Sequence, residues 1–197
     1  MTIYKPKEFD NALPTEGVHL AVCKWEGQTL QKSQYSKAPD GKVIAQLFVF
    51  QIEELVPGKD NMRFQIWRTF PDPAMVSKGG KKKTKYRDFI ESWAGKSLSE
   101  DAAEKFDSKF MLGRACQINI QYDDTGKYAN VKSIMPIPAG MANPPFEVKW
   151  YTRTDGTDEK VYFQKLDAEA KAWFAANIDA PEPHNSTSGE GEEDLPF

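Results

Sequence analysis

Residues 43–55 read VIAQLFVFQIEEL, a run of β-branched, aromatic and aliphatic side chains that stops just before Pro57-Gly58. A run of this composition, closed by a Pro-Gly pair, is typical of a buried strand. Phe48 and Phe50 share one face of that strand with Ile44 and Ile52, so we expect both rings in the core. This strand is the centre of the predicted sheet.

Residues 60–70 form the next predicted strand. Its apolar side chains fall on one face and its polar side chains on the other, because strand residues alternate between faces. Trp67 is the aromatic exception on the polar face, beside Arg63 and Gln65. Arg68 interrupts the apolar face, which indicates that the strand leaves the core there.

A third period-two segment begins at Gly17 and precedes the central strand. Val18, Leu20 and Val22 are predicted to face the core. Trp25 falls on the opposite face, so we expect it to lie away from the core.

Residues 84–112 change to helical spacing. Thr84 is the predicted N-cap of a first helix that ends at Gly95. Ser97 and Glu100 form a predicted capping box for a second helix. Five aromatic residues at helical spacing, here and near the end of the chain, are predicted to be core: Trp93, Phe106, Phe110, Trp173 and Phe174.

Two hairpins are predicted after the helices. Residues 114–122 and 128–137 flank Asp124-Thr125-Gly126, a tight-turn signal. Residues 146–154 and 160–166 flank Asp155-Gly156, and a short closing helix follows from Leu166.

Three strands, a helical insert and a hairpin form the strand order of the five-stranded oligonucleotide-binding (OB) barrel. The expected class is therefore mainly β with inserted helices, and a small sandwich with inserted helices is the alternative. Four segments are predicted: an N-terminal arm (1–14), the OB-like domain (15–140), an appended hairpin and helix packing on it (141–178), and a disordered linker with an acidic tail (179–197).

Composition supports one good-sized domain, with 197 residues of which 40% are hydrophobic. No apolar run is long enough for a membrane span, and the first ten residues lack the apolar stretch of a signal peptide. Cys23 and Cys116 have no metal-binding spacing, which favours a reduced, cytoplasmic setting. Six of the 29 acidic residues and none of the 26 basic ones lie at or after Asp179, so residues 1–178 carry a net charge of +3.

Cations and aromatic rings are the groups with which proteins hold unpaired nucleic-acid strands, through phosphates and stacked bases. Six positive charges fall within residues 78–87, and Trp67 is the first choice for a stacking ring. The candidate DNA-binding residues are Trp67, Arg63, Gln65, Arg68, Lys78, Lys81, Lys82, Lys83, Lys85, Arg87, Trp25 and Tyr35.

The last eight residues combine an acidic run with an apolar tip. Glu190, Glu192, Glu193 and Asp194 have no counter-charge nearby, and Leu195, Pro196 and Phe197 follow them. Such a segment should stay extended in water, with a tip suited to a small pocket on a partner.

This tip resembles that of bacterial and bacteriophage single-stranded DNA-binding proteins, which end in acidic residues, an apolar residue, Pro and Phe. Leu195 stands where the bacterial proteins usually have Ile. Because the body does not resemble the bacterial form, a phage-type relative is expected. The resemblance implies unspecific binding of single-stranded DNA in replication, recombination and repair, in the host cytoplasm. It also implies that the tail recruits replication or recombination proteins, and self-association is a further expectation.

Two other function classes stay open. One is an OB module of a replication complex that binds proteins and not DNA. The other is a metal-dependent nuclease using Glu53-Glu54 or Asp123-Asp124, although these acids lie at strand ends. No catalytic motif, metal ligand set or cofactor motif is evident, so we expect no enzyme activity, no cofactor and no metal.

Overall fold

The computed structural model describes residues 12–34, 36–71, 73–75, 83–153 and 155–177. Within them lie five strands, two α-helices before the fourth strand with a short 3-10 helix, and one long helix at the end. They are β1 (Gly17–Lys32), β2 (Lys42–Leu55), β3 (Arg63–Pro71), α1 (Lys85–Ala94), α2 (Glu100–Glu104), η1 (Ser108–Met111), β4 (Ala115–Tyr122), β5 (Ala129–Met135) and α3 (Glu159–Asn177).

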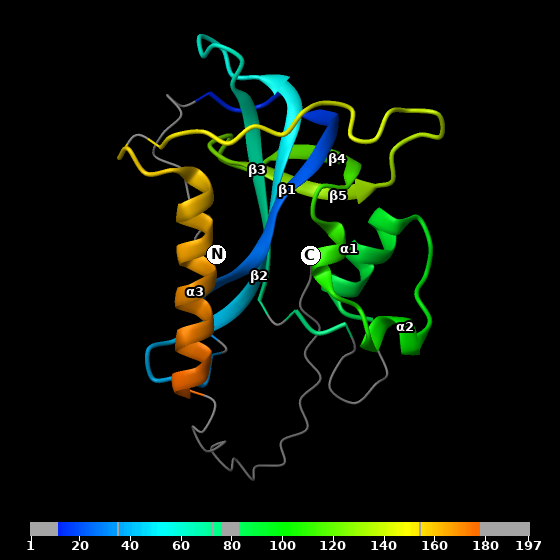
Figure 1. The fold of residues 1–197 in the computed structure, drawn as a ribbon. Coiled ribbons are helices and arrows are strands. Elements are labelled where there is room, and N and C mark those ends of the chain that lie inside the picture. The colour runs from blue at the N-terminus through cyan, green and yellow to red at the C-terminus, as the bar shows by residue number, and fades with distance from the viewer. Residues whose placement is uncertain (1–11, 35, 72, 76–82, 154, 178–197) are drawn as a thin grey trace.

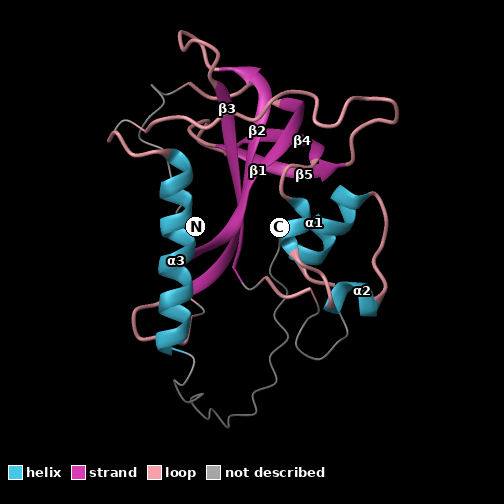
Figure 2. Cartoon of the chain, in the orientation of Figure 1, coloured by secondary structure: helices cyan, strands magenta, loops and turns pink. Residues whose placement is uncertain are grey.

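All five strands belong to one antiparallel sheet in the order β3-β2-β1-β4-β5 (Figure 1). The prediction of a mainly β protein with inserted helices is confirmed, and so is the hairpin of β4 and β5. Helix α3 runs alongside β1, whereas α1 and α2 lie on the other side of the sheet (Figure 2).

The main core lies between the inner face of the sheet and α1. Phe48 and Phe50 are fully buried there, as predicted, and their rings pack against Phe89 and Trp93 of α1. Aromatic rings of this size dominate core energetics because each removes a large apolar area from water. The helix that supplies them begins and ends at local signals: the Thr84 side chain accepts a hydrogen bond from the Arg87 N–H, and Gly95 adopts a left-handed φ of 67°.

Strand β1 differs from its prediction in the face that it turns to the core, and it also contains a bulge. Ala21 and Cys23 face the main core, while Val18 is 53% exposed, so the predicted core face was wrong. The register then shifts between Cys23 and Trp25. One extra residue reverses the alternation of faces. Trp25 therefore lies on the outer face as predicted. The cause is the bulge, which the spacing of apolar residues in the sequence did not reveal.

The second predicted hairpin is wrong. Within the described residues this region has a single isolated bridge, between Thr152 and Asp158, and residues 160–166 belong to α3. Phe163 and Leu166 are apolar neighbours on one helix face and pack onto the outer face of the sheet, which favours the helix over an added strand.

Three details of the helical predictions also differ. The second helix is capped by Ser99 and not Ser97, and it ends at Glu104. Two of the five predicted core aromatics, Phe110 and Phe174, are exposed. Helical spacing alone therefore did not determine which aromatic side chains are buried.

Candidate nucleic-acid interface

The outer face of β1, β2 and β3 carries a second apolar cluster. Trp25, Val49 and Trp67 are paired neighbours across the three strands. Phe163 of α3 is fully buried on top of them, with its ring centroid 5.7 Å from that of Trp25 and 5.4 Å from that of Trp67. The two predicted outward tryptophans therefore support α3, and neither is a freely projecting ring.

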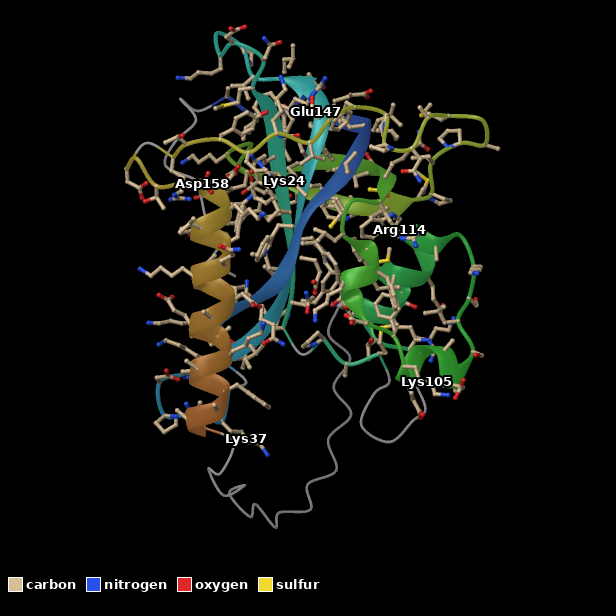
Figure 3. All side chains as sticks on the ribbon, in the orientation of Figure 1. Lys24, Lys37, Lys105, Arg114, Glu147 and Asp158 are labelled. Carbon is tan, nitrogen blue, oxygen red and sulfur yellow. The ribbon has the colours of Figure 1, made fainter. Side chains whose placement is uncertain are left out.

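A buried ion pair fastens the start of α3 to β1. Lys24 Nζ bonds to Glu159 Oε2, and the amine also lies 4.6 Å from the Trp150 ring centroid and 4.7 Å from that of Tyr151. Figure 3 shows Lys24 beside the end of α3 at which Asp158 lies. Burial lowers the pKa of Lys24, and the Glu159 carboxylate opposes that shift.

The segment before α3 crosses the same face next to this ion pair, over the later part of β2 and the start of β3. The Gln51 side-chain amide exchanges hydrogen bonds with the backbone of Lys149, at 2.9 and 3.2 Å. The Tyr151 hydroxyl meets the Gln51 side chain at 3.1 Å and accepts from the Arg63 N–H at 3.0 Å. These contacts use polar groups of the sheet to hold the segment, so this end of the face is covered.

The part of the outer face that remains partly exposed follows β3, the edge strand. We call it the β3 strip; its strand residues are Arg63, Gln65, Trp67 and Thr69, all partly exposed. Because α3 lies along β1, it leaves this edge of the face less covered. Thr69 is held by the Gln31 side chain, whose Nε2 donates to Thr69 Oγ1 at 2.9 Å.

Two residues that the sequence did not single out complete the β3 strip. Tyr162 of α3 packs in the same cluster as Trp67, with its ring 5.5 Å from that of Phe163. The Arg153 guanidinium lies 3.7 Å from the centroid of the Tyr162 ring. A cation stacked on a partly exposed ring is a group that can hold both a base and a phosphate. An Arg followed nine positions later by Tyr gives no recognisable signal in a sequence.

The six positively charged residues predicted within residues 78–87 are not all available to bind a ligand. The Arg87 guanidinium is buried and bonds to Glu91 Oε1 at 2.9 Å, to Glu100 at 2.9 and 3.0 Å, and to the Leu98 carbonyl at 2.7 Å. Lys83 Nζ lies 2.5 Å from Glu91 Oε2. The bonds from Lys83, from Arg87 and from the Leu98 N–H lower the pKa of Glu91 to about 2. Arg87 is thus a structural residue, which the spacing did not predict.

The remaining predicted residues are placed as follows. Lys85 is exposed at the start of α1. Arg63 donates to the Glu53 carbonyl, and its guanidinium lies 4.5 Å from the Phe146 ring centroid. Arg68 points to the other face of β3. Tyr35, Lys78, Lys81, Lys82 and the tail residues 190–197 lie outside the described residues.

Neither nuclease carboxylate pair is arranged as a metal site. Glu54 accepts hydrogen bonds from the N–H and hydroxyl of Thr15, and Asp123 accepts them within its own turn. In the described part of the chain, no group of three or more His, Cys, Asp or Glu could hold a metal ion. None of the helices described there is both long and apolar enough to span a bilayer. Glu54 and Asp123 therefore have structural roles in this fold.

Comparison of the chain with family models, curated proteins and solved structures gave no match.

Proposed function

We propose that the chain is a single-stranded DNA-binding protein of phage type, built on an OB-like barrel. The strand order supports the proposal, because helices lie between the third and fourth strands of a five-stranded antiparallel sheet. OB barrels bind nucleic-acid strands on the face of their second and third strands. The acidic tip that ends in Leu195-Pro196-Phe197 supports the same class independently.

The main support for the proposal is the composition of the β3 strip. Trp67 and Tyr162 offer partly exposed rings on either side of the Phe163 support, and Arg153 lies on the Tyr162 ring. None of the six residues of the strip is acidic. Bases stack on such rings whatever their identity. Arg63 and Arg153 supply positive charge for the phosphates, although Arg153 Nε also lies 3.6 Å from Asp155 Oδ2. The interface would therefore bind without sequence preference.

The tail has a separate role in the proposal. Its carboxylates cannot bind a polyanion, so the tail recruits replication or recombination proteins while the β3 strip holds DNA. Like charges repel, and the acidic run would instead meet a basic rim around a pocket for Phe197.

Titration of poly-dT and of duplex DNA at two salt concentrations, read by quenching of tryptophan fluorescence, tests the binding. Tyr162→Ala should weaken poly-dT binding by about 1–3 kcal/mol, the value of one stacked base. Phe174→Ala is the matched control, because Phe174 is an exposed ring on the same helix. Equal affinities of the two variants would refute the β3 strip as the interface. No binding of poly-dT at low salt would refute the function and favour a module that binds only proteins.

A further inference from the structure

The two edge strands of the sheet, β3 and β5, approach each other. Within the described residues β3 pairs only with β2, and β5 only with β4, yet β3 and β5 lie in contact. Arg68 crosses between them: its Nη1 donates to the carbonyl of Val131 at 3.3 Å. We call this place the β3–β5 junction, defined by Arg68 on β3 and by Val131 on β5.

The Arg68 guanidinium is incompletely satisfied. Its Nε is buried without a hydrogen-bond partner among the described residues. Its other neighbour is the Phe70 ring, whose centroid is 5.2 Å away. No carboxylate of the described chain forms an ion pair with it. Burial lowers its pKa, which shows that the charged form has lost part of its hydration.

The lysine and the arginine that are buried within the described residues, Lys24 and Arg87, are both neutralised. Lys24 pairs with Glu159, and Arg87 pairs with Glu91 and Glu100. Buried charges are normally paired, because an unpaired charge removed from water is costly. Arg68 is partly exposed, but its Nε is buried and it has no carboxylate partner among the described residues, so it departs from that pattern. Lys132, which follows Val131 in the chain, is exposed. The junction has positive charge and donors but lacks an anion.

We propose that the β3–β5 junction is an anion site, at which Arg68 binds a phosphate group of the nucleic-acid backbone. This inference rests on the proposed function and names where one phosphate is held. A phosphate supplies several acceptor oxygens and the missing negative charge, and a guanidinium matches its geometry with two parallel N–H donors. Trp67 and Arg68 are consecutive on an edge strand, so their side chains leave it on opposite faces. A DNA strand that crosses the β3 edge therefore places a base on one face and a phosphate on the other.

Arg68→Gln tests the site against Arg114→Gln. Arg114 is a matched control, because its guanidinium also donates to a backbone carbonyl, from Nε to that of Phe110 at 2.6 Å, but the residue is exposed. It also lies on the far side of the sheet from α3 (Figure 3). The first measurement is the slope of log K against log salt for poly-dT. Arg68→Gln should reduce the magnitude of that slope by about 0.7, the value of one phosphate contact for single strands, and Arg114→Gln should not.

The second measurement uses inorganic pyrophosphate and no nucleic acid. Pyrophosphate should raise the melting temperature of the wild type and of Arg114→Gln, and leave that of Arg68→Gln unchanged. If Arg68→Gln does not fold, Arg68→Lys keeps the charge and should retain the salt slope while losing the pyrophosphate shift in part, because Lys cannot bind two oxygens in parallel.

The outcomes separate the site from the function. If the wild type binds poly-dT but Arg68→Gln and Arg114→Gln give the same salt slope, the anion site is refuted and Arg68 only joins β3 to β5. If the wild type does not bind poly-dT, the proposed function is refuted. In that case the change in melting temperature with pyrophosphate alone tests the anion site. Equal changes for Arg68→Gln and Arg114→Gln would refute the site.

Discussion

Phe163→Ala is the sharpest test of how α3 is held. The Phe163 side chain is fully buried and contacts the rings of Trp25, Trp67 and Trp150, with centroids 5.4 to 6.4 Å away. Together with Leu47 and Val49 it forms the buried part of the second cluster. Its removal leaves a cavity beneath α3 that the surrounding large rings cannot easily fill.

The expected loss of stability is about 3–5 kcal/mol, the range for Phe→Ala in a packed core. The ion pair of Lys24 with Glu159 remains at the end of the helix, and the Gln28 N–H still donates to Asp167 Oδ1 at 2.9 Å. We therefore expect the helix to stay attached but to pack loosely, so the three tryptophans gain contact with water.

Urea unfolding, followed by tryptophan emission and by far-UV circular dichroism, measures both effects. The emission maximum of native Phe163→Ala should move to longer wavelength, and the unfolding midpoint should fall. Val161→Ala is the control, because Val161 is 54% exposed on the same helix and should change stability by less than about 0.5 kcal/mol. A loss below about 1 kcal/mol for Phe163→Ala, without an emission shift, would show that α3 does not rest on the tryptophans.

Three further results are expected. The pKa of Glu91 is about 2 in the folded protein, below its ordinary value of 4.5, so its contribution to stability is present above pH 4.5 and is lost as pH falls towards 2. The difference in urea midpoint between wild type and Glu91→Gln should therefore shrink from pH 5 to pH 3, and a constant difference would contradict this cause. Gly27→Ala should cost about 1–3 kcal/mol in urea unfolding, because its Cβ would lie 2.9 Å from Trp25 Nε1; unchanged stability would mean that the indole moves aside freely. Burial raises the pKa of the Cys23 and Cys116 thiols, so iodoacetamide at pH 8 should modify neither in the native protein and both in urea, as counted by mass spectrometry; rapid native labelling would show that the main core opens.

The sequence determined the features that depend on residues close together in the chain. The period-two pattern of residues 43–55 and 60–70 placed β2 and β3 and put Phe48 and Phe50 in the core. Thr84 and Gly95 marked the ends of α1, since a cap is made by a side chain and a backbone only a few positions apart. Alternation and capping are local, so they can be recognised without the fold.

Tertiary structure alone decided which of the candidate residues are available. The bulge after Cys23 depends on how β1 pairs with β2. The ion pair of Lys24 with Glu159 and the placement of α3 over Trp25 and Trp67 join segments about a hundred positions apart or more. Arg87 likewise looks like a surface cation in the sequence but is enclosed by Glu91 and Glu100. The exposure and the charge balance of a side chain depend on what packs across from it, and the spacing of residues along the chain does not contain that information.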